Sequence, residues 1–182
     1  MSNITLILLS GKRYSGKTFI GNFIKDKLHK YNVKLLNPSD FFKQDFCEKY
    51  KLNYQKILSD RLYKESYRVE MINYYNKIKN KYSLDYYCKK IINYITNTTE
   101  YNIYIIDIRH KFEIMFYEKH NFKIIKIRRD VDDKIRNIRG WIYDKLIDDD
   151  ITETDLDNYN DWDIVLKNDI DNDIIDNIYK LF

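Results

Sequence analysis

The residue pattern best suited to chemistry is the octapeptide GKRYSGKT at residues 11–18. It matches G-x-x-x-x-G-K-[ST], in which two glycines allow successive backbone N–H groups to point at one anion. Lys17 can reach the β- and γ-phosphates of a nucleoside triphosphate, and the Thr18 hydroxyl can ligate Mg²⁺. An apolar run before the loop and a helical pattern after it supply the required context. We therefore predict that a nucleoside triphosphate is held by Gly11, Gly16, Lys17 and Thr18.

Three further charged residues have the types expected around phosphates. Arg13 adds a second cation beside Lys12, and it either contacts a second phosphorylated substrate or is a solvated surface charge. Asp107 ends a buried apolar run, as a metal-organising carboxylate does in such proteins, although a helix or turn cap is the alternative. Arg109, two residues later, can bind a phosphate through two parallel hydrogen bonds.

Two basic pairs lie at helical spacing. Arg136 and Arg139 are three residues apart and precede Gly140, an arrangement that resembles a mobile lid over phosphates. The alternative is a pair of exposed arginines that face solvent. Lys64 and Arg68 lie one helical turn apart, where an ordinary basic helix face is the alternative to a phosphate site.

Hydrophobic periodicity predicts an alternating order of strands and helices around these residues. The predicted strands cover 4–9, 33–37, 101–107, 122–129 and 162–168. The predicted helices cover 16–31, a segment that starts at 41, 54–82 with a break near Asp60, 84–95, 111–120, 132–141 and 171–182. We expect Phe19, Phe23, Ile24 and Leu28 to form the buried stripe of the first helix. Ser39 or Asp40 is expected to cap the second helix, and the acidic stretch 144–161 is expected to be a loop.

Strands that alternate with helices predict an α/β fold, here a P-loop NTPase-type parallel sheet sandwiched by helices. Ligands of such sheets bind at the carboxyl ends of the strands. Three of the predicted strands deliver residues to that edge, namely Gly11, Asp107 with Arg109, and Asn168. The candidate residues are therefore expected to meet at one place.

Composition limits the class of partner. The 182 residues are 44% hydrophobic, which suffices for one core, and the net charge of +4 is too small to make nucleic-acid binding the default. The acidic stretch 144–161 would repel a polyanion, and no apolar stretch is long enough to cross a membrane. Cys47 and Cys88 have no metal-binding spacing. We expect a cytoplasmic (intracellular) protein, monomeric or homodimeric, whose partner is a small phosphorylated substrate, with no nucleic acid and no membrane.

Several sequence blocks resemble a known family. SGKRYSGK, LNYQKILSDRLYKESYRVEMI, DYYCKKII, IIDIRH, RNIRGW and LDNYNDWDIVLKN occur in the order found in animal-type phosphomevalonate kinases. The arrangement is also similar to the phage deoxynucleoside monophosphate kinases, with fewer matching residues. Both groups are P-loop kinases that pass the γ-phosphoryl group of ATP to a phosphate monoester. The resemblance implies a nucleoside monophosphate kinase-like fold in one domain, with a helical acceptor-binding region at about 40–95 and a lid at about 130–150.

The resemblance also implies a role for individual residues. ATP would be bound by Gly11, Lys12, Ser15, Gly16, Lys17, Thr18 and Asn168, and Mg²⁺ by Thr18 and Asp107. The acceptor would be bound by Arg13, Lys64, Arg68, Lys89, Arg109 and His110. Catalysis would depend on Lys17, Arg109, Arg136 and Arg139, the last two as lid arginines.

Departures from the family pattern bear on the acceptor. His110 follows Arg109 where the family carries two adjacent arginines, and Lys89 replaces an arginine. Phosphomevalonate carries a carboxylate as well as a phosphate, and the forked guanidinium of arginine suits both groups. The absence of two arginines therefore disfavours phosphomevalonate as the acceptor. Tyrosine rings that could stack on a base are Tyr74, Tyr75, Tyr82, Tyr86 and Tyr87. We therefore expect a (deoxy)nucleoside monophosphate as acceptor, with 5-phosphomevalonate as the alternative and a non-catalytic nucleotide-binding protein as a more distant one.

Overall fold

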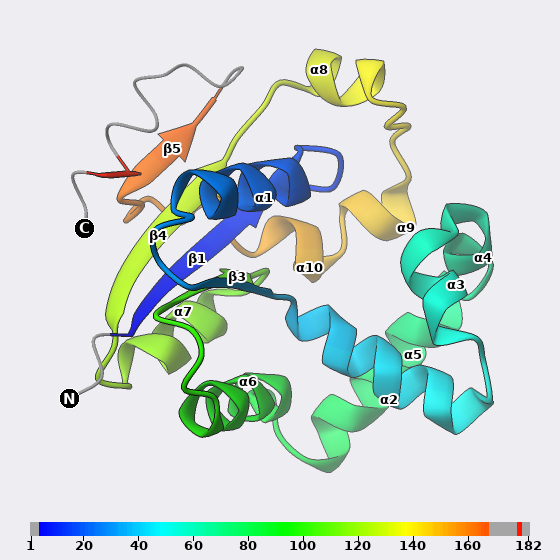
Figure 1. The fold of residues 1–182 in the computed structure, drawn as a ribbon. Helices are drawn as coiled ribbons and strands as arrows, with labels where there is room; N and C mark the ends of the chain where they lie inside the picture. Colours follow the sequence, from blue (N-terminus) through cyan, green and yellow to red (C-terminus); the bar gives the residue numbers. More distant parts are fainter. Residues whose placement is uncertain (1–3, 168–177, 180–182) are drawn as a thin grey trace. The chain divides into compact units, whose positions relative to one another are not determined.

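A parallel five-stranded sheet forms the centre of the larger part of the chain (Figure 1). The computed structural model describes residues 4–167 and 178–179. The strand order is β2-β3-β1-β4-β5, and every pairing is parallel. The strands are β1 Thr5–Gly11, β2 Val33–Leu36, β3 Ile103–Asp107, β4 Lys123–Arg129 and β5 Ile164–Leu166. The predicted α/β fold with a parallel sheet is confirmed.

The central strand explains why an apolar run precedes the phosphate-binding motif. All seven residues of β1 are buried, because the strand pairs with β3 on one side and β4 on the other and both sheet faces are covered. Ile7 and Leu9 pack in the same core cluster as Ile20 and Ile24 of α1, Lys17–Lys27. Successive residues of a strand point to opposite faces, so Leu6 and Leu8 fill the other side. Neighbouring strands on both sides and packed side chains on both faces thus fix the position of β1.

The buried stripe of α1 differs from the predicted one. Ile20, Ile24 and Leu28 are each 1% exposed, whereas Phe19 is 65% exposed. The prediction for Phe19 was wrong, because the neighbouring residue, Ile20, faces the sheet in its place. Phe19 stacks on Phe23 outside the core, with ring centroids 6.5 Å apart.

The described chain divides into two units. The sheet unit consists of residues 1–36 and 98–182, and the helical unit of residues 37–97. The helical unit contains α2 Pro38–Tyr50, α3 Tyr54–Ser59, α4 Arg61–Ser66, α5 Arg68–Lys81 and α6 Tyr86–Asn97. Its core is formed by Phe46, Cys47, Ile57, Met71 and Tyr74.

Polar caps set the helix boundaries in the helical unit. The predicted break at Asp60 is confirmed, since its carboxylate accepts a hydrogen bond from the Tyr63 N–H at 3.0 Å and starts α4. The predicted cap of α2 was wrong. Asn37 caps this helix by accepting from the Ser39 N–H at 3.0 Å, because Pro38 already occupies the first helical position.

The rest of the sheet unit carries short helices. These are α7 Lys111–Glu118, α8 Asp133–Ile138, α9 Lys145–Asp148 and α10 Ile151–Thr154. The acidic stretch 144–161 was predicted as a loop, yet α9 and α10 lie in it. Asp144 and Asp150 are the N-cap residues of these two helices. The prediction was wrong because aspartates that favour loops also favour the N-cap position. The helix predicted for 171–182 lies outside the described residues except at 178 and 179.

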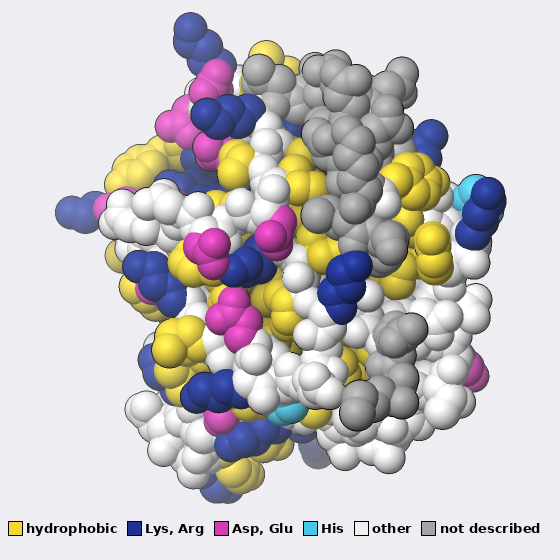
Figure 2. All heavy atoms as spheres, turned by 90° about the vertical axis from the view of Figure 1, so that its left-hand side faces the viewer, with side chains coloured by type: hydrophobic (Ala, Val, Ile, Leu, Met, Phe, Trp, Pro, Cys, Tyr) yellow, Lys and Arg dark blue, Asp and Glu magenta, His cyan; other side chains and the backbone are white. Residues whose placement is uncertain are grey.

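The surface carries both signs of charge. Figure 2 shows basic and acidic side chains interspersed on the face that it presents, without a continuous basic surface among the described residues. In the same described part of the chain, every helix is too short or too polar to cross a lipid bilayer.

Candidate active site

Two glycines allow the phosphate-binding loop to close on itself. Gly11 has φ +152°, and a Cβ there would lie 2.6 Å from the Arg129 carbonyl oxygen and 2.7 Å from Ser15 Oγ. Gly16 has φ +90°, and a Cβ there would lie 2.9 Å from a guanidinium nitrogen of Arg139. Other residue types would meet a strained φ at both positions, and at Gly11 also a clash with the Arg129 backbone. The glycine spacing of the motif is therefore a requirement of the loop's geometry.

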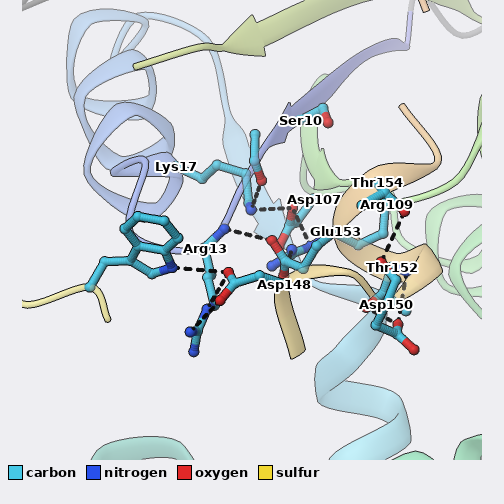
Figure 3. Close-up of polar contacts among 12 residues, drawn as sticks. Ser10, Arg13, Lys17, Asp107, Arg109, Asp148, Asp150, Thr152, Glu153 and Thr154 are labelled. Carbon is cyan, nitrogen blue, oxygen red and sulfur yellow. Dashed lines mark hydrogen bonds and ion pairs between the residues drawn. The ribbon is translucent and has the colours of Figure 1, made fainter. Parts of the chain in front are cut away.

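Lys17 lies at the centre of the loop (Figure 3). It is 8% exposed, donates a hydrogen bond to the Gly11 carbonyl, and its Nζ lies 3.9 Å from Asp107 Oδ1. Burial lowers the pKa of Lys17 to about 8, and the Arg109 guanidinium acts in the same direction. A cation buried in this way gains from any additional anion that reaches it.

The turn after β3 holds a carboxylate and a guanidinium side by side. Arg109 Nε lies 3.7 Å from Asp107 Oδ1. Glu113 fixes this turn by accepting hydrogen bonds from the backbone N–H groups of Arg109, at 2.6 Å, and His110, at 2.8 Å. Burial raises the pKa of Glu113 to about 7. Sequence reasoning did not identify Glu113, although an acid three residues after a helix start is a capping-box signal.

Asp107 has a property that suits a metal ligand. Its Oδ1 atom is buried and accepts no hydrogen bond within the described part of the chain. Buried carboxylate oxygens usually accept a hydrogen bond, so one that accepts none beside a phosphate-binding loop fits a divalent cation. The second predicted ligand, Thr18, has an exposed side chain.

Arg13 and Arg136, one of the two predicted lid arginines, meet around Asp148. Arg13 donates two hydrogen bonds to the Asp148 carboxylate, at 2.8 and 2.7 Å. Arg136 donates to the same carboxylate at 3.3 Å, to Asp133 at 2.7 Å and to the Arg13 carbonyl at 3.1 Å. Its guanidinium also lies over the Trp141 ring, 3.7 Å from the centroid. Arg136 is only 4% exposed, so in this conformation it is a buried structural cation and not an exposed one.

Arg139 differs from Arg136. Its side chain is exposed, and it donates to the carbonyl of Ser15 at 2.6 Å and to that of Tyr14 at 3.3 Å. Ser15 itself is 1% exposed. Arg139 therefore lies directly on the phosphate-binding loop.

Acidic residues of the segment 144–161, here called the acidic segment, pair with cations at the carboxyl edge of the sheet. Glu153 bonds Arg109 at 2.5 Å. Asp157 lies 2.8 Å from Lys12 Nζ and 3.0 Å from an Arg128 nitrogen. A further carboxylate, Asp155, lies 3.3 Å from His110 Nδ1, and His110 is 7% exposed. Sequence reasoning missed these partners, although an acidic run in a chain with many basic site residues was a signal for them.

The remaining predicted residues are not among the described residues of the sheet unit. Lys64, Arg68 and Lys89 belong to the helical unit, where Arg68 bonds Glu65 twice at 2.6 Å and Lys89 pairs with Asp85 at 2.9 Å. Asn168 lies outside the described residues. The sheet unit thus brings together the loop, Asp107, Arg109, His110 and the two arginines of the predicted lid.

Comparisons with known proteins bear on the reaction. A family model described as phosphomevalonate kinase matches residues 9–124. The phosphomevalonate kinase of Drosophila melanogaster is 30% identical over 178 residues, which cover 94% of this chain and 93% of that protein.

Solved structures resemble the chain in fold. The protein TT1252 from Thermus thermophilus matches with a TM-score of 0.56 at 13% identity, covering 98% of this chain and 95% of that one. Shikimate kinase from Acinetobacter baumannii, solved with shikimate, matches with a TM-score of 0.51 at 11% identity, covering 99% and 93%. At such low identity these likenesses support the fold alone.

The family match includes the end of β1, the whole phosphate-binding loop and the turn that carries Asp107 and Arg109. The relative's match extends over nearly the whole of both chains, so it includes the segment with Arg136 and Arg139 as well. These residues are cations and a carboxylate, the residue types expected around the phosphates of such a reaction. The chain belongs to the phosphomevalonate kinase family and is a phosphotransferase that has a phosphate group as its acceptor.

Proposed function

We propose that this chain transfers the γ-phosphoryl group of ATP to the phosphate of 5-phosphomevalonate. An oxygen of the acceptor phosphate attacks the γ-phosphorus, the bond to the β–γ bridging oxygen breaks, and 5-diphosphomevalonate and ADP leave. The observation that carries the proposal is the 30% identity to the Drosophila melanogaster phosphomevalonate kinase over 94% of this chain.

Phosphoryl transfer to a phosphate acceptor requires cationic groups rather than a general base. A phosphate monoester is ionised near neutral pH, so its oxygen attacks without prior removal of a proton. Catalysis then consists of positioning and of neutralising the charge on the transferred group. Lys17 and Arg109 lie at the loop for this purpose, and Arg139 is the exposed lid arginine nearest to it. Arg136 then holds the lid through Asp148 and Trp141.

Magnesium fits the residues present. Two protein groups would hold it, namely Asp107 Oδ1, which accepts no hydrogen bond within the described residues, and the hydroxyl of the exposed Thr18. No group of three or more His, Cys, Asp and Glu side chains with metal-binding geometry occurs among the described residues, so phosphate oxygens and water would complete the set. The ion, when bound, supplies positive charge to the β- and γ-phosphates.

Two features favour phosphomevalonate over the nucleoside monophosphate that the sequence alone favoured. The first is the family match. The second is that most tyrosines expected to stack on a base are engaged within the helical unit. Tyr74 and Tyr87 are 6% and 7% exposed, and Tyr75 packs between Phe42 and Tyr87 with centroids at 5.7 and 6.2 Å. The remaining two, Tyr82 and Tyr86, stack on each other at 4.7 Å.

The other expected roles are part of the same proposal. Residues of about 40–95 would bind the acceptor through Lys64, Arg68 and Lys89, and residues of about 130–150 would act as the lid. Gly11, Lys12, Ser15, Gly16 and Asn168 would bind ATP, and Arg13 and His110 the acceptor.

A coupled assay for ADP release tests the proposal. With ATP and Mg²⁺, we expect turnover with phosphomevalonate that exceeds turnover with any nucleoside monophosphate at equal concentration. Lys17→Ala is the control, because it removes the cation at the γ-phosphate and leaves the coupling enzymes unaffected. Turnover with a nucleoside monophosphate and none with phosphomevalonate would contradict the proposal.

A further inference from the structure

Glu153 holds its carboxylate between two groups that normally bind phosphate. Its Oε2 accepts a hydrogen bond from the backbone N–H of Arg13, in the phosphate-binding loop, at 2.7 Å (Figure 3). Its Oε1 accepts from Arg109 Nη1 at 2.5 Å. The side chain is 9% exposed. Both oxygens of a buried anion are thus bonded to a loop amide and a guanidinium.

These two donors have the chemistry of an anion site. Backbone N–H groups of such a loop and a guanidinium fork are the usual partners of phosphate oxygens. Burial is the main reason for the lowered pKa of Lys17, and the Glu153 charge acts on Lys17 in the opposite direction. Glu153 therefore lies within the electrostatic reach of the lysine that would meet the γ-phosphate. A phosphate at the same donors would lose two hydrogen bonds to Glu153 and be repelled by its charge.

The helix that carries Glu153 is short and is not part of the sheet. Glu153 belongs to α10, a single turn of helix that starts at the Asp150 cap. Neighbouring residues of the acidic segment attach to the same part of the molecule through ion pairs, such as Asp148 with Arg13 and Asp157 with Lys12. Phosphates compete for the same cations, so anion binding weakens the attachment.

We propose that Glu153 is an internal anion that a substrate phosphate must displace, and that it thereby determines which ligands the site accepts. A ligand must bring more negative charge than the carboxylate it replaces, so a phosphate with two charges binds and a single carboxylate does not. The inference rests on the proposed function in that the site binds a phosphorylated substrate.

Binding of inorganic pyrophosphate to the full chain tests this directly by isothermal titration calorimetry. Glu153→Gln keeps the shape of the side chain and removes its charge. We expect this variant to bind pyrophosphate about tenfold more tightly than the wild type, because one nearby like charge is lost. Glu100→Gln, at an exposed position of the same unit, makes the same change in net charge and should leave the affinity unchanged. Unchanged or weaker binding by Glu153→Gln would overturn the inference.

Two further measurements separate the possible outcomes. Glu153→Ala also removes the charge and should tighten binding in the same direction, so the test survives if one variant folds poorly. In the kinase assay, Glu153→Gln should lower the KM for phosphomevalonate while kcat stays within about threefold. A fall in kcat at constant KM would mean that Glu153 instead positions Arg109, and would refute the inference. Tighter pyrophosphate binding without any turnover of phosphomevalonate would uphold the inference and refute the proposed function.

Discussion

Replacing Asp148 by asparagine should destabilise the sheet unit by about 2.5 kcal/mol at neutral pH. Although burial raises the pKa of this carboxyl, hydrogen bonds from Arg13, from the Asp144 N–H and from Trp141 lower it from 3.8 to about 2. The difference between 3.8 and about 2 corresponds to about 2.5 kcal/mol of unfolding free energy. Asparagine carries no charge and has one acceptor oxygen. Among the described residues, Arg136, at 4% exposure, would then keep only the exposed Asp133 as a charged partner.

The stabilising contribution of Asp148 should decrease at low pH. Because the folded pKa of Asp148 is below the unfolded one, its contribution is complete above about pH 4 and is lost as the pH falls toward 2. Urea unfolding can be followed by tryptophan fluorescence, since both tryptophans of the chain, Trp141 and Trp162, belong to the sheet unit. The deficit of Asp148→Asn relative to the wild type should shrink to about half between pH 7 and pH 3.

Asp149→Asn is the matched control. Asp149 is the next residue, is exposed, and accepts only from the Tyr143 hydroxyl, at 3.0 Å, among the hydrogen bonds in the described chain. It should change the unfolding free energy by less than about 0.5 kcal/mol. If both variants lose the same small amount at pH 7, or if the deficit of Asp148→Asn is as large at pH 3 as at pH 7, the reasoning about this cluster is wrong.

Four further predictions concern the loop, the metal and the turn after β3. Lys17→Ala should lower kcat at least about a thousandfold in the coupled ADP-release assay, and an unchanged kcat would remove this lysine from the mechanism. Gly16→Ala combines a φ of +90° with a Cβ 2.9 Å from Arg139, so urea unfolding should show a loss of about 1–2 kcal/mol and calorimetry weaker binding of a non-hydrolysable ATP analogue. Chelation with EDTA should abolish turnover and Mg²⁺ should restore it, whereas turnover that persists would exclude the metal. Burial raises the folded pKa of Glu113 to about 7, so wild-type stability should fall by about 3 kcal/mol as the pH rises from about 4.5 through 7; Glu113→Gln should lack this decline, and an identical pH profile would contradict it.

The local parts of the site could be predicted from sequence. The spacing of Gly11 and Gly16 encodes the turn of the loop, because the positive φ that both positions adopt is a property of the local backbone. Asp107 follows an unbroken apolar run, so its place at the carboxyl edge of the sheet follows from the strand itself. The break at Asp60 was predictable for the same reason, since an N-cap acts over three residues.

Long-range pairings could not be predicted. Arg13 bonds Asp148, 135 residues later, and Glu153, 140 residues later. Nothing in the local pattern of a charged residue states which distant partner neutralises it. The sequence therefore predicted a lid arginine at Arg136, with a solvent-facing arginine as the alternative, and did not predict its burial against Asp148. The acidic stretch was predicted as a loop, although its carboxylates meet the site's cations. The single-position error in the α1 stripe arose because Phe19 and Ile20 are both apolar, and only the sheet decides between them.

The most direct test of the assigned reaction is ³¹P nuclear magnetic resonance of the wild-type chain with ATP, Mg²⁺ and 5-phosphomevalonate. We predict that the monoester resonance of the acceptor is replaced by the coupled pair of a diphosphate, in equal amount with the ADP formed. An acceptor resonance that stays unchanged, while added nucleoside monophosphates are converted to diphosphates, would contradict the assignment.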